Sequence, residues 1–201
     1  MQRRGHDQKM VTKKVKKMDI SVVVPVYNEE DNVIPLFNET NAVLKKLKKK
    51  YEIIFIDDGS RDRTYQNLMK IKDSHCVELK QRGNFGQSAA MDAGMKAAKG
   101  DIVVMMDGDL QNDPKDIPKL LAKMKEGYDI VSGWRYKRKD PLGKRIASRI
   151  AFRIRRRVAR LDIHDSGCSL KSYTKESLED IDLTGEMHRF IPDLCLLKGF
   201  R

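Results

Sequence analysis

The sequence predicts an α/β fold in which helices flank a mostly parallel, Rossmann-like sheet. Short apolar or β-branched runs alternate with longer segments of helical periodicity, and acidic clusters directly follow three of these runs. The strand-like runs lie at 20–26, 53–56, 76–79, 102–106 and 129–132. The helix-like segments lie at 30–48, 62–73, 87–98 and 115–126. Because strands that alternate with helices build parallel sheets covered on both faces, we expect one α/β domain.

Composition and charge favour a globular protein that binds an anionic partner. The chain has 201 residues, of which 40% are hydrophobic and 35% are charged, and its formal net charge is +12. This length suits a single domain with a buried core. The positive charge favours phosphorylated substrates, an anionic membrane surface or nucleic acid. No specific nucleic-acid partner is expected, because the basic segment lacks interleaved aromatic residues and any recognition motif.

The cysteines and the N-terminus favour a cytoplasmic location. Cys76, Cys168 and Cys195 are far apart and form no CxxC pair, which predicts reduced thiols rather than a disulfide framework or a zinc site. No apolar run approaches the roughly 20 residues that span a bilayer. The N-terminus also lacks the apolar core of a signal peptide. Residues 1–18 carry seven basic side chains without apolar periodicity, which predicts a flexible basic arm.

Three acidic clusters follow predicted strands and are expected to meet at one edge of the sheet. They are Tyr27-Asn28-Glu29, Asp57-Asp58 and Asp107-Gly108-Asp109. Parallel α/β sheets bind ligands outside the carboxyl ends of their strands, so this edge is the candidate site. A carboxylate at 57–58 suits the ring N–H of uracil or guanine, whereas Ser60 or Asp62 is expected to cap the next helix.

The segment Asp107-Gly108-Asp109 has the composition of a divalent metal site. Mg²⁺ and Mn²⁺ prefer a few carboxylate oxygens together with phosphate oxygens of the substrate, and Gly108 lets a diphosphate approach the backbone. Taken alone, the same residues also fit an ordinary turn. A phosphatase-type loop is disfavoured by Gln111, and an EF-hand is disfavoured because its ligand ladder and closing Glu are missing.

Taken together, these segments resemble glycosyltransferase family 2, whose members have the GT-A fold. The matching stretches are SVVVPVYNEEDNV (21–33), EIIFIDDGSRDRT (52–64), NFGQSAAMDAGMKAAKGDIVVMMDGDLQNDP (84–114), GWRYKRKD (133–140), DSGCSLKSY (165–173) and GEMHRF (185–190). Within the family, MDGDLQNDP and the basic stretch after GWR are most similar to polyprenyl-phosphate hexosyltransferases. That group includes dolichol-phosphate mannosyltransferase and its bacterial relatives.

The resemblance implies a donor site for a UDP- or GDP-sugar. The residues implied to bind the nucleotide-sugar are Pro25, Tyr27, Glu29, Ile56, Asp58, Asp107, Gly108 and Gln111. Asp107 and Asp109 are implied to hold Mg²⁺ or Mn²⁺, and Gln111 is implied to order their loop. The resemblance further implies direct inversion at the anomeric carbon, without a covalent intermediate.

The resemblance also implies an acceptor side that binds a polyprenyl phosphate. Arg135, Arg149 and Arg189 are implied to face the acceptor phosphate or the diphosphate, although Arg149 equally fits a solvated basic face. Asp165 is a candidate catalytic or metal-proximal carboxylate alongside Asp109, and it equally fits a turn. A lipid phosphate is already anionic and needs little help from a base. A glycan hydroxyl acceptor would instead require a carboxylate base.

A basic amphipathic helix is predicted at 142–160. Its apolar residues recur every fourth position, with arginines around them. Two interpretations remain open: the stripe packs on the sheet with its arginines reaching outward, or it lies on an anionic bilayer. With the basic arm, this helix predicts a peripheral protein on the inner face of the membrane.

The predicted organisation is one GT-A domain over 19–201. Its nucleotide-sugar half covers about 19–134, and its acceptor-side half covers about 135–201. Because members of the family continue beyond the position of Arg201, we expect a C-terminally truncated form. Three functions remain open: transfer to a polyprenyl phosphate, transfer to a glycan hydroxyl, and nucleotide binding without turnover. A homo-oligomer is compatible with each of them.

Overall fold

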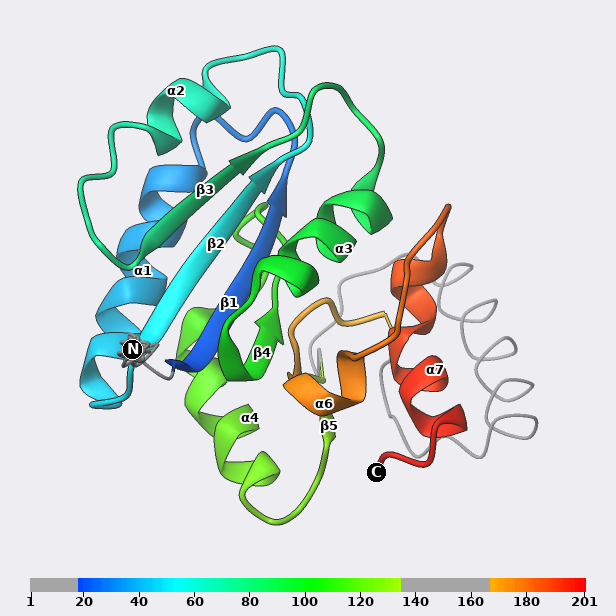
Figure 1. Cartoon of the computed structure of the whole chain (residues 1–201). Coiled ribbons are helices and arrows are strands. Elements are labelled where there is room, and N and C mark those ends of the chain that lie inside the picture. Colours follow the sequence, from blue (N-terminus) through cyan, green and yellow to red (C-terminus); the bar gives the residue numbers. More distant parts are fainter. Residues whose placement is uncertain (1–17, 135–166) are drawn as a thin grey trace, which may run out of the picture.

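The computed structural model of the chain describes residues 18–134 and 167–201. It contains a six-stranded sheet with the order β3-β2-β1-β4-β6-β5. Helices cover both faces of this sheet (Figure 1). The pairs β1–β2, β1–β4 and β2–β3 are parallel, whereas β6 is antiparallel to both β4 and β5. The expected basic arm, apart from Met18, and the expected helix at 142–160 lie outside the described residues.

The five predicted strands and four predicted helices are all present, with shifted ends. The strands are β1 Met18–Val26, β2 Tyr51–Asp57, β3 Cys76–Lys80, β4 Gly100–Met105, β5 Ile130–Ser132 and β6 Lys171–Thr174. The α-helices are α1 Val33–Lys46, α2 Thr64–Leu68, α3 Gln87–Ala97, α4 Ile117–Met124, α6 Lys175–Leu178 and α7 Ile191–Leu197. The described residues also include two short 3-10 helices, η1 Pro114–Asp116 and η2 Met187–Phe190.

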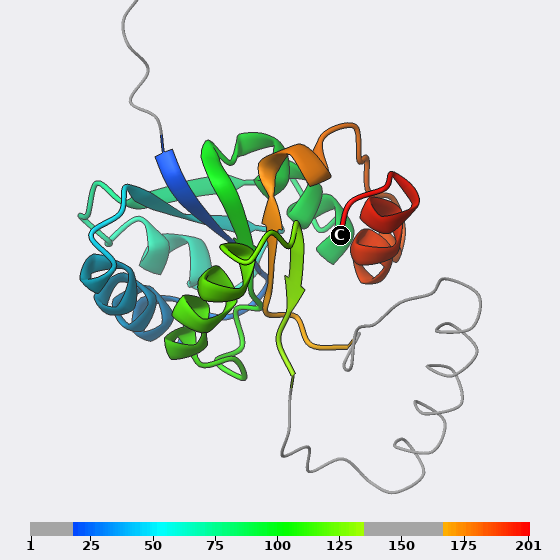
Figure 2. The same ribbon diagram turned by 90° about the horizontal axis from the view of Figure 1, so that it is seen from below.

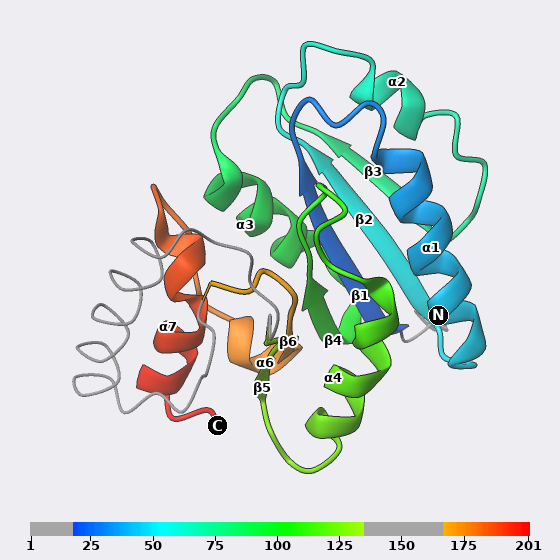
Figure 3. The ribbon, with the colours of Figure 1, turned by 180° about the vertical axis from the view of Figure 1, so that it is seen from behind.

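The two faces of the sheet carry separate hydrophobic cores. In β1, Val22 and Val24 enter the core formed with α1 and α4, whereas Val23 enters the core formed with α3 and α7. All three are completely buried, as expected for a central parallel strand covered on both sides. Figure 2 shows α1 and α4 on one side of the sheet, and Figure 3 shows α1 to the right of the strands and α7 to the left.

A buried polar cluster fixes the turn between α3 and β4. The hydroxyl of Ser21 donates to Glu52 Oε1 at 2.6 Å, and the backbone N–H of Lys99 donates to the same oxygen at 2.8 Å. The N–H of Gly100 donates to Ser21 Oγ at 2.8 Å. A Cβ on Gly100 would lie 2.5 Å from the backbone nitrogen of Ser21, so a larger residue would push β4 away from β1.

The structure corrects two expectations about secondary structure. The helix predicted at 62–73 ends at Leu68, because the chain tightens into turns there and Ile71 packs on the core. The short strand β6 was not predicted, because Lys-Ser-Tyr-Thr carries no apolar alternation. Its place is set by pairing with β4 and β5, which lie far from it in the sequence.

The side chain of Asp73 ties α1 to the start of β3. Its carboxylate accepts hydrogen bonds from Asn41 Nδ2 at 2.9 Å, from the backbone N–H of His75 at 3.0 Å and from His75 Nδ1 at 2.7 Å. The bonds from the backbone and then the ring of His75 hold the pKa of Asp73 below its usual range. The ring of His75 also stacks on Tyr51 at 4.2 Å.

We predict that Asp73→Asn destabilises the domain at neutral pH by about 1–2 kcal/mol, because a charged acceptor is lost. The folded-state pKa lies below the unfolded value, so this stabilisation is complete above about pH 4–5 and is lost at lower pH. Urea unfolding at pH 7 and at pH 3 should therefore show a smaller effect of the substitution at pH 3. An equal effect at both values would contradict the prediction.

Candidate active site

The loops that follow β1 and β2 are joined by hydrogen bonds between backbone and side chains. The N–H of Asn28 donates to Ser60 Oγ at 2.9 Å, and the N–H of Arg61 donates to Asn28 Oδ1 at 2.9 Å. The N–H of Glu29 donates to Thr64 Oγ1 at 2.7 Å. Asn28 has a φ of 56°, a left-handed conformation that asparagine tolerates better than most residues. The two loops therefore hold each other in one arrangement.

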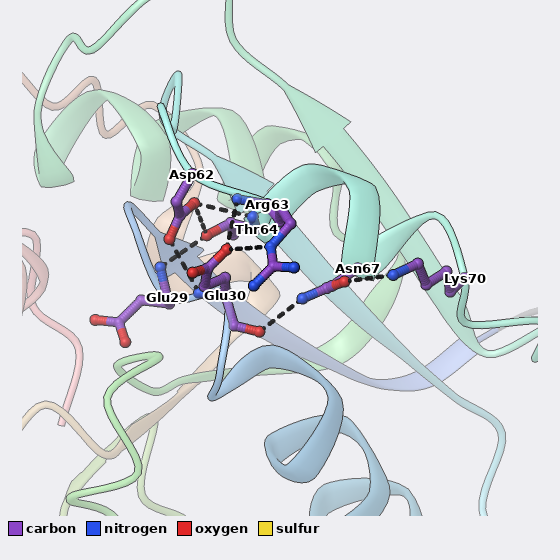
Figure 4. A network of polar contacts seen from close by, with 7 residues as sticks. All are labelled: Glu29, Glu30, Asp62, Arg63, Thr64, Asn67 and Lys70. Atoms are coloured by element: carbon purple, nitrogen blue, oxygen red, sulfur yellow. Dashed lines mark hydrogen bonds and ion pairs between the residues drawn. The ribbon is translucent and has the colours of Figure 1, made fainter.

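Glu30 adds a second set of contacts between the same loops (Figure 4). Its Oε2 accepts hydrogen bonds from the backbone N–H and from Nε of Arg63, both at 2.9 Å. These bonds from Arg63 lower the pKa of Glu30. The N–H of Glu30 donates to Asp62, and its carbonyl accepts from Asn67. The carboxylate of Glu29 points away from this network in Figure 4 and lines a cavity.

Asp58 connects the end of β2 to the loop before α3. Its two carboxylate oxygens accept the backbone N–H groups of Phe85 and Gly86, each at 2.8 Å, and the residue is only 4% exposed. Gly59 allows this contact, because it has a φ of +71° and a Cβ there would lie 2.5 Å from the carbonyl carbon of Gly83. Each oxygen of Asp58 keeps a second lone pair, so the predicted contact with a base stays chemically open.

A cavity of about 380 Å³ lies at the carboxyl ends of β1, β2 and β4; we refer to it as the first cavity. The predicted site residues that line it are Pro25, Tyr27, Glu29, Asp58, Asp107, Gly108 and Asp109. The lining residues that were not predicted include Asn84, Gly86 and Gln87. The structure thus brings together seven of the predicted residues, from three segments of the chain.

Two residues predicted to bind the nucleotide-sugar, Ile56 and Gln111, are not among those that line the first cavity. Ile56 is completely buried and belongs to the core between the sheet and α3, where its Cδ1 would lie 2.7 Å from a Cβ on Gly94. It is not among the residues that line the first cavity. Gln111 is exposed, and its backbone N–H donates to Asp109 Oδ1 at 3.1 Å. Its part in ordering the loop stays a prediction.

Gly108 lets the loop after β4 close onto β1. A Cβ on Gly108 would lie 2.6 Å from Val26 Cγ1 and 3.2 Å from the carbonyl oxygen of Pro25. Leu110 follows with a φ of 60°, which sharpens the turn. This close approach places Asp107 and Asp109 on the wall of the same cavity as Glu29.

Asp107 and Asp109 fit a divalent cation that also binds oxygens of a substrate. The pKa of Asp107 is raised, chiefly because burial disfavours its charged form, and the carboxylate of Asp109 raises it further. A hydrogen bond with Ser169 and the charge of Lys171 act in the opposite direction. A bound cation would relieve both unfavourable effects. Within 18–134 and 167–201, no three His, Cys, Asp or Glu residues are grouped as metal ligands, so substrate oxygens would complete the shell.

A second cavity, of about 440 Å³, adjoins the first and shares Gln87 and Asp107 with it. Gln87 Nε2 donates to Asp107 Oδ1 at 2.8 Å, at the boundary between the two cavities. The other lining residues are Met91, Met105, Gly167, Cys168, Ser169, Lys171, Tyr173, His188 and Arg189.

Of the residues predicted for the acceptor side, Arg189 lines this second cavity. Arg135, Arg149 and Asp165 lie outside the described residues. Sequence reasoning did not single out Lys171 or assign a ligand to His188. The signal in the sequence was their presence in DSGCSLKSY and GEMHRF, two segments already recognised as typical of the family.

Comparison with known proteins identifies the family. Residues 21–182 match the model of glycosyl transferase family 2. The chain belongs to this family. The chain is 42% identical over 184 residues to a dodecaprenyl-phosphate galacturonate synthase of Rhizobium johnstonii, covering 89% of this chain and 54% of the relative. It is 38% identical over 179 residues to an undecaprenyl-phosphate 4-deoxy-4-formamido-L-arabinose transferase of Salmonella enteritidis, covering 88% of this chain and 55% of the relative.

The chain therefore spans about half the length of these two relatives. Glucosyl-3-phosphoglycerate synthase from Mycobacterium tuberculosis, in complex with Mn²⁺ and UDP-glucose, is similar in structure. Its TM-score is 0.64 at 22% identity, over 83% of this chain and 59% of that protein. The structure of the same enzyme in complex with UDP has a TM-score of 0.62 and covers 80% of this chain and 58% of that protein. This likeness confirms the predicted GT-A fold. No helix in the described part of the chain is long and apolar enough to cross a membrane.

We predict that Asp58→Asn destabilises the domain by about 1–3 kcal/mol, because an amide NH₂ facing a backbone N–H leaves a buried donor without an acceptor. Chemical unfolding measures the change. Asp182→Asn is the matched control, since Asp182 is an exposed carboxylate that pairs with Lys96 on the surface. It should cost less than about 0.5 kcal/mol. Equal costs for the two variants would contradict the role given to Asp58.

Proposed function

We propose that this domain transfers a hexose from a UDP- or GDP-sugar to a polyprenyl phosphate, with inversion at the anomeric carbon. The observation that carries the proposal is the junction of two cavities at Asp107, one lined by the acidic strand ends and the other by basic side chains. The names of the two relatives support a polyprenyl phosphate as acceptor. Membership of glycosyl transferase family 2 supports transfer of a sugar.

The first cavity is the proposed site of the nucleotide. Pro25, Tyr27, Glu29 and Asp58 would contact the nucleoside, which places the diphosphate toward Asp107 and Gly108. The joined loops support this assignment, because a pocket with fixed walls loses little conformational entropy on binding.

Mg²⁺ or Mn²⁺ is the proposed cofactor, held by Asp109 and Asp107. The paired carboxylates and the raised pKa of Asp107 support this choice. So does the Mn²⁺ bound by the structurally similar synthase. When bound, the metal would act as a Lewis acid and stabilise the negative charge that develops on the leaving diphosphate.

The proposed reaction is a direct displacement. An oxygen of the acceptor phosphate attacks the anomeric carbon, the bond from that carbon to the diphosphate oxygen breaks, and the nucleoside diphosphate leaves with the electron pair. Because the attacking oxygen is already anionic, the protein contributes mainly position and electrostatic stabilisation. We assign Arg189, Arg135 and Arg149 to the acceptor phosphate. Asp165 and Asp109 stay the two candidate catalytic carboxylates.

The proposed location is the inner face of a membrane, as a peripheral protein. The net charge of +12 supports attraction to anionic lipids. A polyprenyl acceptor would also bring the reaction to the bilayer surface.

We predict that one nucleoside diphosphate, UDP or GDP, raises the melting temperature of the domain in the presence of Mn²⁺. At about 100 times the dissociation constant, a ligand stabilises the folded state by about 2.7 kcal/mol. Asp109→Asn should abolish most of this shift, because it removes a carboxylate from the metal. Asp113→Asn, an exposed carboxylate nearby in the sequence, should retain the shift. If neither nucleotide stabilises the wild-type domain, the donor site is wrongly assigned.

We further predict that farnesyl phosphate, a short soluble polyprenyl phosphate, accepts the sugar in preference to simple saccharides. The measurement is the rate of formation of glycosylated lipid from a sugar nucleotide, compared with that of glycosylated saccharide. A higher rate with saccharides would favour a hydroxyl acceptor. Nucleotide binding without any transfer would indicate a binding module.

A further inference from the structure

The loop at 107–112, which carries Asp107 and Asp109, is held by side chains rather than by backbone pairing. Just before it, the N–H of Met106 donates to the carbonyl of Val23 at 3.1 Å. From 107 to 112, no backbone group is hydrogen-bonded to another backbone group of the described residues. The path of this loop, and with it the position of its two carboxylates, therefore depends on side-chain contacts.

Two hydrogen bonds tie the ends of the loop to different parts of the domain. At its start, Asp107 Oδ1 accepts Gln87 Nε2 of α3 at 2.8 Å. At its end, Asn112 Nδ2 donates to Ser169 Oγ at 2.7 Å, although the two residues are 57 positions apart. The second bond connects the loop to the segment that leads into β6.

Ser169 belongs to a well-fixed part of the chain. Its neighbours Cys168 and Leu170 are each 3% exposed and lie in the core formed with α1 and α4. The carbonyl of Leu170 also accepts the N–H of Gly133 at 2.8 Å. Because its neighbours cannot shift without opening the core, the hydroxyl of Ser169 is a fixed point against which the loop is placed.

A hydroxyl suits this place because it can serve two different partners. Ser169 and Asp107 both line the second cavity, and a hydrogen bond from Ser169 acts to lower the pKa of Asp107. An amide NH₂ can only donate, and an ionised carboxylate can only accept. The oxygen of Ser169 can therefore accept from Asn112 while its proton is directed to Asp107.

We propose that Ser169 and Asn112 are positioning residues for the metal: their hydrogen bond fixes the loop at 107–112 so that Asp109 and Asp107 present their carboxylates to one cation. This inference rests on the metal-dependent function proposed above. It assigns neither positioning residue a contact with the metal or the sugar.

The geometry of the cation gives the physical reason. Mg²⁺ requires near-octahedral coordination by oxygen, so its ligands must be held in a narrow range of positions. A loop without anchors would have to be ordered when the metal binds, and that ordering costs conformational entropy. The bond between Asn112 and Ser169 orders the loop beforehand, which should strengthen the part of nucleotide binding that depends on the metal.

The test is calorimetric titration of UDP and of GDP into the whole chain, once with excess Mn²⁺ and once with EDTA. With Mn²⁺, Ser169→Ala and Asn112→Ala should each weaken binding of the nucleotide about fivefold, the loss expected for one hydrogen bond between neutral groups. With EDTA, their affinities should stay within about twofold of the wild type. Ser74→Ala, which removes an exposed hydroxyl just before β3, is the matched control and should change neither value.

Two further variants separate the bond from a general effect on folding. Ser169→Thr keeps the hydroxyl, so its affinity with Mn²⁺ should exceed that of Ser169→Ala. The double variant Ser169→Ala/Asn112→Ala should bind about as tightly as Ser169→Ala alone, because both substitutions remove the same bond. Melting curves of each unliganded variant show that it is folded.

The outcomes distinguish this inference from the proposed function. If Mn²⁺ strengthens binding equally in the wild type and in the Ser169 and Asn112 variants, the inference is wrong, whereas the proposed function stands. If the variants lose as much affinity with EDTA as with Mn²⁺, the two residues shape the nucleotide pocket and the inference is also wrong. If Mn²⁺ does not strengthen nucleotide binding in the wild type, the proposed metal site and this inference both fail.

Discussion

The parallel pairing of β1 with β2 on one side and β4 on the other is the constraint on which the site depends. Val26 is in register with Asp57, so β1 and β2 end at the same level. The strand β4 ends at Met105, opposite Val23, and the segment that follows it places Gly108 beside Val26. The segments that follow them must therefore meet at one edge. Two glycines then remove the remaining steric obstacles, because Gly59 and Gly108 allow backbone contacts that a Cβ would block.

Around this edge many polar side chains form hydrogen bonds that hold the loops in place. Asn28, Glu30 and Asp58 use their side chains to hold loops, which leaves the carboxylate of Glu29 facing the first cavity. Such second contacts limit how far a binding group can drift from its working position. The loops can carry several acidic residues because each carboxylate of the network is hydrogen-bonded to N–H donors rather than placed against another carboxylate.

Charge is separated across the two cavities. The carboxylate of Asp109 lies on the first cavity, and the cations of Lys171 and Arg189 lie on the second. Asp107 and the amide of Gln87, which are hydrogen-bonded to each other, line both cavities. Burial raises the pKa of Asp107, so its carboxylate is less stable in this position than it would be in water. This arrangement would favour binding of a cation in the first cavity and of an anion in the second. The two proposed ligands, a metal-bound diphosphate and a lipid phosphate, match this arrangement of charge.

The sequence by itself determined the alternation of strands and helices, and it located the acidic segments at strand ends. It could do so because periodicity and the residues flanking a strand are local properties. Only the tertiary structure decided that Ile56 packs beneath α3 and that β6 enters the sheet between β4 and β5. It alone brought Ser88 to His188 and Lys171 to the wall of the second cavity. These contacts join residues far apart in the chain, and they are set by the packing of α3, β6 and η2 on the sheet, for which no local pattern exists.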